Sequence, residues 1–167
     1  MKTIVKVLLI ALIVPVISQC KKDPESINIK DDNFLNALIG RGVDKNNDGI
    51  ISPTEAEGVT FLNVCSCNIS DLKGIEAFVN LDTLDCSTNQ LTSLDVSNNT
   101  ALTSLWCSGN PLTSLDVSNN TSLEYRYCIS MPSLAKVCAW TIPFPPTGVA
   151  IDTTGSPNVN FTMTCSK

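Results

Sequence analysis

The sequence predicts a repeat solenoid: a short β-rich stack capped by a helix-loop-helix unit at its N-terminal end and by a β segment at its C-terminal end. Two observations predict this fold. Residues 81–101 and 102–122 repeat each other with a period of 21 residues. Directly before the repeats, residues 31–58 carry two helical patterns around an Asn- and Asp-rich loop. A repeat this short buries its apolar residues only by stacking on a neighbour, so both ends of the stack need covers.

Residues 1–19 are predicted to be a signal peptide. Lys2 and Lys6 precede an apolar stretch over residues 7–17, which is shorter than the roughly 20 residues of a membrane-spanning helix. The sequence ISQC, which ends at Cys20, resembles the lipobox of bacterial lipoproteins. This resemblance implies a lipid on Cys20, and Lys21 after it implies the outer membrane or cell surface of a Gram-negative bacterium. A plain secretory peptide and an uncleaved anchor are the alternatives.

Residues 20–30 are polar and contain a proline, which predicts a tether between the lipid and the folded domain. The chain has 11 basic and 16 acidic residues, and loss of the two leader lysines leaves nine basic residues and a net charge of −7. Nucleic acid is disfavoured as a partner, because binding to phosphates depends on clustered Lys and Arg. The apolar content of 43% suits one domain, which we expect to be monomeric.

Residues 31–58 are predicted to form two short helices that flank a loop. The sequence DDNFLNALIG places apolar residues on one helical face after an aspartate cap, and Gly40 and Gly42 end the helix. Ser52 and Glu55 form a capping box with Pro53 at the first helical position, so a second helix is expected to run to about Gly58.

The loop DKNNDGIISPTE, residues 44–55, resembles the calcium loop of an EF-hand and of dockerin modules. The resemblance implies one Ca²⁺ ion, with oxygen ligands at loop positions 1, 3, 5, 7, 9 and 12 and a glycine at position 6. The implied ligands are Asp44, Asn46, Asp48, the carbonyl group of Ile50, Ser52 and Glu55. The alternative is a solvated turn, which explains the composition but not the match at all of these positions.

Residues 59–139 are predicted to form the repeats. Both complete copies match L-x-x-L-x-C-x-x-N-x-L-x-x-L-x-V, which resembles the short, irregular bacterial class of leucine-rich repeats, and ISDLKGI in the preceding coil resembles the internalin type. Residues 62–80 and 123–140 align as flanking coils, the second of them degraded. The pattern places Leu81, Leu84, Leu91, Leu94 and Val96 inward and predicts a ladder of Asn89 and Asn110 at the bends.

The cysteines fall into two groups. Cys86, Cys107 and Cys128 recur every 21 residues at an inward position, where stacked Cβ atoms about 4.8 Å apart are too distant for a relaxed disulfide. We interpret them as core residues. Cys138 and Cys165 bracket the C-terminal segment and are the disulfide candidate. A zinc site is disfavoured, because the chain has no histidine.

Trp106, Tyr125 and Tyr127 occupy outward positions of neighbouring coils on a face otherwise made of Ser, Thr and Asp. An exposed aromatic patch is typical of a partner-binding surface. The alternative is that the C-terminal cap, residues 140–167, folds over these rings. Its prolines lie outside two alternating runs, GVAID and NVNFTMT, which predict two closing strands.

These observations predict a non-enzymatic module at the cell surface that binds a protein or glycan partner and is stabilised by one Ca²⁺ ion. The absence of histidine and of any G-x-S-x-G or phosphate-binding loop disfavours catalysis. The alternative is an assembly role, in which the calcium unit docks onto a partner module and the repeats serve as a spacer.

Overall fold

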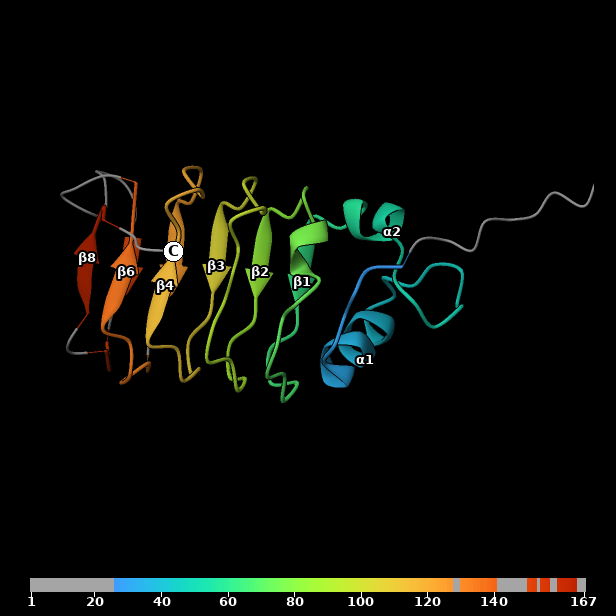
Figure 1. Cartoon of the computed structure of the whole chain (residues 1–167), viewed down its shortest axis with the longest axis horizontal. Helices are drawn as coiled ribbons and strands as arrows, with labels where there is room; N and C mark the ends of the chain where they lie inside the picture. The colour runs from blue at the N-terminus through green and yellow to red at the C-terminus, as the bar shows by residue number, and fades with distance from the viewer. Residues whose placement is uncertain (1–25, 128–129, 141–149, 153, 157–158, 165–167) are drawn as a thin grey trace, which may run out of the picture.

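The computed structural model describes residues 26–127, 130–140, 150–152, 154–156 and 159–164. They form a β-solenoid of about four turns, and a small helical segment lies at the N-terminal end of the stack (Figure 1). The predicted repeat solenoid is therefore confirmed. None of the helices in these ranges is long and apolar enough to cross a membrane.

The helical segment contains α1 (Asp32–Gly40) and α2 (Pro53–Glu57), as the capping signals predict. Asp31 caps α1 by accepting hydrogen bonds from the backbone N–H groups of the first turn. Ser52 and Glu55 form the predicted capping box of α2. Helix α1 buries Phe34 and Leu38 completely, whereas Ile39, which was expected on the same face, stays 37% exposed.

Two parallel sheets form the solenoid. The first has the strand order β1 (Phe61–Asn63), β2 (Thr83–Asp85), β3 (Ser104–Trp106), β5 (Tyr125–Tyr127) and β7 (Ala150–Asp152). The second has the order β4 (Ser114–Asp116), β6 (Lys136–Cys138) and β8 (Asn160–Thr162), and the bridge between Asp95 and Asp116 continues it by one coil. A short 3-10 helix, η1 (Ile75–Ala77), lies in the first coil.

The register follows the sequence repeat. Leu62 pairs with Leu84, and Leu84 pairs with Leu105, so the inward leucines lie one above the other. All the leucines and the valine that were predicted to point inward are buried. Because each fully buried leucine contributes about 1.5–3 kcal/mol, this column is the main source of stability in the stack.

The C-terminal segment extends the stack. Both predicted strands form, as β7 and β8, but they do not pair with each other. β7 joins the first sheet beside β5, and β8 joins the second sheet beside β6. Strand pairing thus continues beyond residue 139, because alternating runs in a chain that already winds as a solenoid find partners in the coil before them.

The predicted asparagine ladder is confirmed. The Asn89 amide nitrogen donates to the carbonyl groups of Val64 and Cys86, both at 2.9 Å, and its oxygen accepts from the N–H group of Ile69 at 3.0 Å. Asn110 makes equivalent contacts one coil later. Buried backbone groups that cannot pair within a strand are satisfied by these side chains.

A second asparagine ladder was not predicted. Asn99 and Asn120 are fully buried. The Asn99 amide nitrogen donates to the carbonyl groups of Ile75 and Phe78, and that of Asn120 donates to Val96 and Asn99, all at 2.9 Å. The motif LDVSNNT, which occurs in both complete repeats, is typical of a turn in which the aspartate bonds local backbone amides. Its aspartates do accept from the N–H groups two residues later, but its last asparagine supports the bend of the preceding coil.

The cysteine column is also confirmed where it is described: Cys86 and Cys107 are fully buried thiols. Cys128 lies outside the described residues. Cys138 is disulfide-bonded, while Cys165 lies outside the described residues, so the pairing of these two cysteines stays a prediction.

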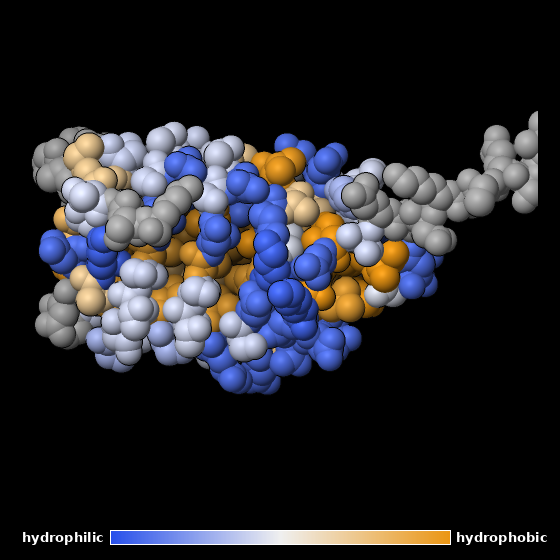
Figure 2. Space-filling model, viewed as in Figure 1, coloured by the Kyte–Doolittle hydropathy of each residue, from blue (hydrophilic) through white to orange (hydrophobic). Residues whose placement is uncertain are grey.

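Figure 2 shows apolar surface over the helical segment and its junction with the first coil, and also between polar side chains along the coils. Three of the four large apolar residues that are exposed in the described ranges lie in this N-terminal part: Ile39, Phe61 and Val79. Phe61 is the most exposed of these three and lies at the junction between the helical segment and the first coil.

The asparagine ladder gives a first prediction. Asn89→Ala should lower the free energy of unfolding by about 3 kcal/mol or more, because it leaves several buried N–H and C=O groups without partners. Asn98→Ala, at an exposed position one residue before the second ladder, should change it by less than about 0.5 kcal/mol. Urea denaturation measures both, and equal costs would show that the buried amide is not structural.

Candidate functional site

The loop between α1 and α2 is folded around the carboxylate of Asp44, which is only 6% exposed. One of its oxygens accepts from the N–H group of Asn47 at 2.7 Å, and the other accepts from Gly49 at 3.0 Å. Gly49 has a φ of +82°, a left-handed conformation that glycine adopts without strain. The first loop residue therefore lies inside the turn, and its carboxylate is held there by backbone donors.

Glu55 closes the loop from the other end. Its Oε1 accepts from the N–H group of Lys45 at 2.8 Å, while Oε2 accepts from the N–H and hydroxyl groups of Ser52 at 2.9 and 2.8 Å. The bonds from Ser52 and Lys45 outweigh burial and lower the pKa of Glu55. The last loop residue is thus an ionised carboxylate that bonds the backbone at both ends of the loop.

The donor types of this loop fit a calcium ion, because carboxylate, amide and hydroxyl oxygens and one carbonyl group are the ligands that this hard cation takes. The side chains of the loop, however, are not oriented as a set of calcium ligands. Asp48 accepts from the Asn46 amide nitrogen at 2.8 Å, and no group of three His, Cys, Asp or Glu side chains is gathered as a metal cluster in the described part of the chain. Calcium binding requires Asn46 and Asp48 to turn their oxygens toward a common point.

Asp31 joins the helical segment to the first coil. Its Oδ1 caps α1 by accepting from Asn33 and Phe34 at 2.9 and 3.1 Å. Its Oδ2 accepts from the N–H and hydroxyl groups of Ser70 at 2.8 and 2.7 Å and from the N–H group of Asp71 at 3.1 Å. Burial opposes ionisation of this group, but the bonds from Ser70, Phe34 and Asp71 together lower its pKa.

Two further side chains connect the same parts. The Asn33 amide nitrogen donates to the carbonyl group of Asn68 at 3.0 Å, and that of Asn80 donates to the carbonyl group of Glu57 at 2.9 Å. The helical segment is therefore attached to the first coil near the start of α1 and near the end of α2.

The segment before α1 was predicted to be a tether, and this prediction is wrong for residues 27–29. The N–H group of Ile27 donates to the carbonyl group of Ile51 at 2.8 Å, and Ile27 and Ile29 pack on the core. They cross the first coil at Gly74, where a Cβ atom would lie 2.7 Å from Ile29. The alternating isoleucines of SINIK were the sequence signal for this contact.

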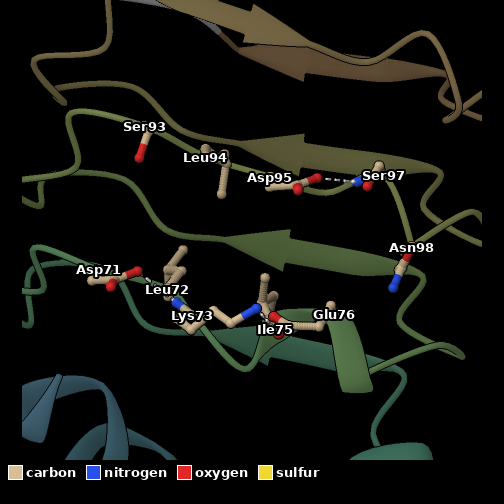
Figure 3. Close-up of a pocket in the computed structure, with 10 residues that line it drawn as sticks. All are labelled: Asp71, Leu72, Lys73, Ile75, Glu76, Ser93, Leu94, Asp95, Ser97 and Asn98. Atoms are coloured by element: carbon tan, nitrogen blue, oxygen red, sulfur yellow. Dashed lines mark hydrogen bonds and ion pairs between the residues drawn. The ribbon is translucent and has the colours of Figure 1, made fainter. Parts of the chain in front are cut away.

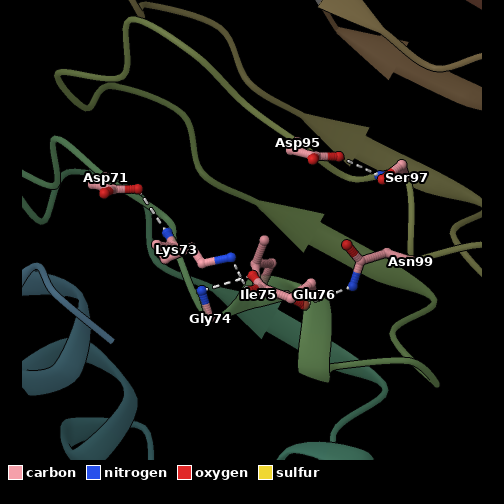
Figure 4. Close-up of polar contacts among 8 residues, drawn as sticks. All are labelled: Asp71, Lys73, Gly74, Ile75, Glu76, Asp95, Ser97 and Asn99. Carbon is pink, nitrogen blue, oxygen red and sulfur yellow. Dashed lines mark hydrogen bonds and ion pairs between the residues drawn. The ribbon is translucent and has the colours of Figure 1, made fainter. Parts of the chain in front are cut away.

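A pocket of about 240 Å³ lies between the first coil and the next one (Figure 3). Its charged side chains form hydrogen bonds and an ion pair with residues close to them in the sequence, as Figure 4 shows. Lys73 forms an ion pair with Glu76, and its N–H group donates to Asp71. The hydrogen bond and charge of Glu76 raise the pKa of Lys73. Asp95 accepts from the N–H group of Ser97, so the pocket is a polar seam between coils rather than a gathered catalytic set.

The outward face of the first sheet carries Trp106, which is half-buried. The backbone register places Ser104 beside Tyr125 and Trp106 beside Tyr127. The side chains of the two tyrosines lie outside what the structure describes, so the aromatic patch stays a prediction. On the other side of Trp106, its register partner Asp85 of strand β2 is only 9% exposed.

Comparison with known proteins places this fold. No protein-family model and no curated protein sequence matches the chain. Among solved structures, an internalin (inlF) from Listeria monocytogenes superimposes with a TM-score of 0.56 and 21% identity, over 83% of this chain and 44% of that one. An internalin C2 (inlC2) from the same organism has a TM-score of 0.51 and 21% identity, over 78% of this chain and 62% of that one.

The fold is an internalin-like leucine-rich-repeat solenoid. This chain spans less than two thirds of the length of either internalin. At 21% identity the likeness concerns the fold alone, and proteins of one fold carry different sites. The helical segment at the end of this stack contains both the calcium-type loop and Asp31, which contacts the first coil.

Asp31 gives the second prediction. Asp31→Ala should lower the free energy of unfolding by about 2–3 kcal/mol at pH 7, because an N-cap and charge-assisted bonds to the first coil are lost. The folded pKa is lowered from 3.8, so the stabilisation is complete well above pH 3.8 and is lost as the pH falls through the folded pKa.

The difference between the wild-type chain and Asp31→Ala should therefore shrink below about pH 4 in urea titrations. Asp32→Ala is the matched control, since Asp32 is exposed in the first turn of α1 and contributes only through the helix dipole, about 0.3–1 kcal/mol. A difference that does not change with pH would contradict the role assigned to the Asp31 carboxylate.

Proposed function

We infer that the chain is a non-enzymatic surface module that binds a protein or glycan partner with the outward face of its first sheet. The observation that carries this proposal is the placement of Trp106 on that face, in register with Tyr127 and next to the strand that begins with Tyr125. Aromatic side chains supply large contact areas at low entropic cost, and they dominate the binding energy of many interfaces.

The chemistry of the chain supports binding rather than catalysis. It contains no histidine, and the carboxylates of Asp31, Asp44, Glu55 and Asp95 accept hydrogen bonds from nearby donors. A catalytic site needs a nucleophile or base aimed at a reacting atom. The internalin-like fold supports the same assignment, since an extended solenoid offers a regular face on which a partner can bind.

Export and lipid attachment at Cys20 complete the proposal. They rest on the apolar leader and the lipobox-like sequence, and they would place the module on the outer membrane or cell surface of a Gram-negative bacterium. Incorporation of labelled fatty acid, lost in Cys20→Ala, tests this attachment.

A calcium ion in the loop of residues 44–55 would stabilise the module by fixing the two helices as a cap. The ligands would be Asp44, Asn46, Asp48, Ile50, Ser52 and Glu55. The coil contacts of Asp31 and Asn33 support a cap and argue against the alternative in which the calcium unit is an independent docking module. The ion would neutralise the negative charge that three carboxylates bring into one turn.

The third prediction concerns the aromatic face. Trp106→Ala should weaken partner binding at least tenfold, measured by capture of surface-labelled proteins and by glycan-array binding with the purified chain. Lys136→Ala, on a strand of the other sheet, should leave binding within a factor of two. Equal capture by both variants, with unchanged melting temperatures, would refute the assignment of this face.

The fourth prediction concerns calcium. An unpaired loop with three carboxylates should bind Ca²⁺ with a Kd of about 10⁻⁴ to 10⁻³ M. Calcium at 100 times the Kd then adds about 2.7 kcal/mol to the free energy of unfolding. Titration calorimetry should detect binding, and a chelator should lower the melting temperature of the whole repeat domain.

Asp48→Ala should abolish the calcium response, because it removes a ligand from the loop. Asp95→Ala, a carboxylate in a repeat turn, should keep it. If titration calorimetry detects no Ca²⁺ binding to the wild-type chain, the calcium proposal is wrong.

A further inference from the structure

Strand β1 has an open edge. It ends the strand order of its sheet, and among the described residues no strand pairs with its other side. The N–H group of Val64 donates to Asp85 at 2.7 Å, and the carbonyl group of Thr60 accepts from Thr83 at 3.0 Å. Since backbone groups alternate in direction along a strand, Phe61 and Asn63 present their N–H and C=O groups to the open edge.

A groove of about 690 Å³ runs along this edge. One wall is the strand itself, residues 60–63, and the other is the helical segment, including Val43 and Val59. Phe61 is 60% exposed at the groove. A three-residue strand is roughly 10 Å long at about 3.3 Å per residue, so the groove has room for a short extended peptide beside β1.

The charge of the groove is opposite to that of the chain. Arg41 and Lys45 line it, in a chain whose net charge is −5. Glu55 also lies there, but both of its oxygens accept hydrogen bonds from the loop. Two cations beside an open strand edge and an exposed phenylalanine favour a peptide that combines acidic and apolar side chains.

We propose that this groove binds an extended acidic peptide, which adds as a strand to β1. The backbone of the peptide pairs with the outward N–H and C=O groups of Phe61 and Asn63. Its apolar side chains contact Phe61, and its acidic side chains face Arg41 and Lys45. This site goes beyond the proposed aromatic face, from which it is separated by β2.

Fluorescence anisotropy with the full chain tests the proposal. The probe is a fluorescein-labelled ten-residue peptide of alternating valine and aspartate, and the comparison peptide has lysine in place of aspartate. The aspartate peptide should bind at least tenfold more tightly. The double variant Arg41→Glu, Lys45→Glu should lose at least tenfold in affinity, whereas Lys30→Glu, at an exposed position outside the groove, should change it less than twofold.

A matched pair of variants tests the backbone pairing. Asn63→Pro removes an edge N–H group and leaves the backbone hydrogen bonds to β2 in place. The side-chain bond from Asn63 to Asp85 of β2 is lost in Asn63→Pro and in Asn63→Ala alike, so binding of the aspartate peptide should be at least tenfold weaker in the proline variant than in the alanine variant. Trp106→Ala should leave peptide binding unchanged, which separates this site from the aromatic face. The proposal is overturned if both peptides bind equally, if the two Asn63 variants bind equally, or if sedimentation shows a dimer that Asn63→Pro abolishes, because a second copy then occupies the edge.

Discussion

The open end of a stack is the constraint on which the rest of this structure depends. A coil of about 21 residues buries its leucines only against another coil, and the first coil has none before it. Leu62, Ile69 and Leu72 of that coil are nevertheless buried. They belong to one apolar cluster with Phe34 and Leu38 of the helical segment. The helices therefore take the place of a preceding coil, and Asp31 fixes them there through its bonds to Ser70 and Asp71.

This arrangement ties the proposed sites to one scaffold. The cap covers the apolar interior of the first coil but leaves the backbone edge of β1 open, because helices offer side chains rather than paired strands. The calcium-type loop follows α1 in the sequence, whereas the coil contacts of Asp31 precede it. Lys45 and Glu55 of this loop nevertheless line the β1 groove. The aromatic positions lie on later strands, where the register is set by the leucine column.

Most of the fold could be predicted from the sequence because its determinants are periodic. A strict repeat places Leu105 over Leu84 and Asn110 over Asn89, and helix capping depends on residues a few positions apart. The ladder of Asn99 and Asn120 was missed, since Ser-Asn-Asn satisfies turn chemistry equally well and only the contacts with the preceding coil show which amide is buried. The packing of Ile27 and Ile29 was missed for the same reason: their partner, Gly74, lies in a different part of the chain.

The candidate sites could be predicted less completely. The loop residues and the outward aromatic positions follow from spacing, but the orientation of Asn46 and Asp48 depends on hydrogen bonds that spacing does not determine. The β1 groove has no motif at all. The groove forms where the helical segment meets strand β1. The sequence alone does not show that Arg41 and Lys45 lie beside the open edge of Phe61 and Asn63.

Native-state hydrogen exchange tests most directly whether the helices and the coils form one cooperative unit. The relevant amides are Leu35 and Arg41 in the helical segment and Val64 and Cys86 in the first coils, all of which donate to backbone carbonyl groups. If the helices are a true cap, the Arg41 amide should exchange through openings with the same free energy as those of Val64 and Cys86, within about 0.5 kcal/mol. An opening of Arg41 that is several kcal/mol easier, while Val64 and Cys86 keep their protection, would contradict this account.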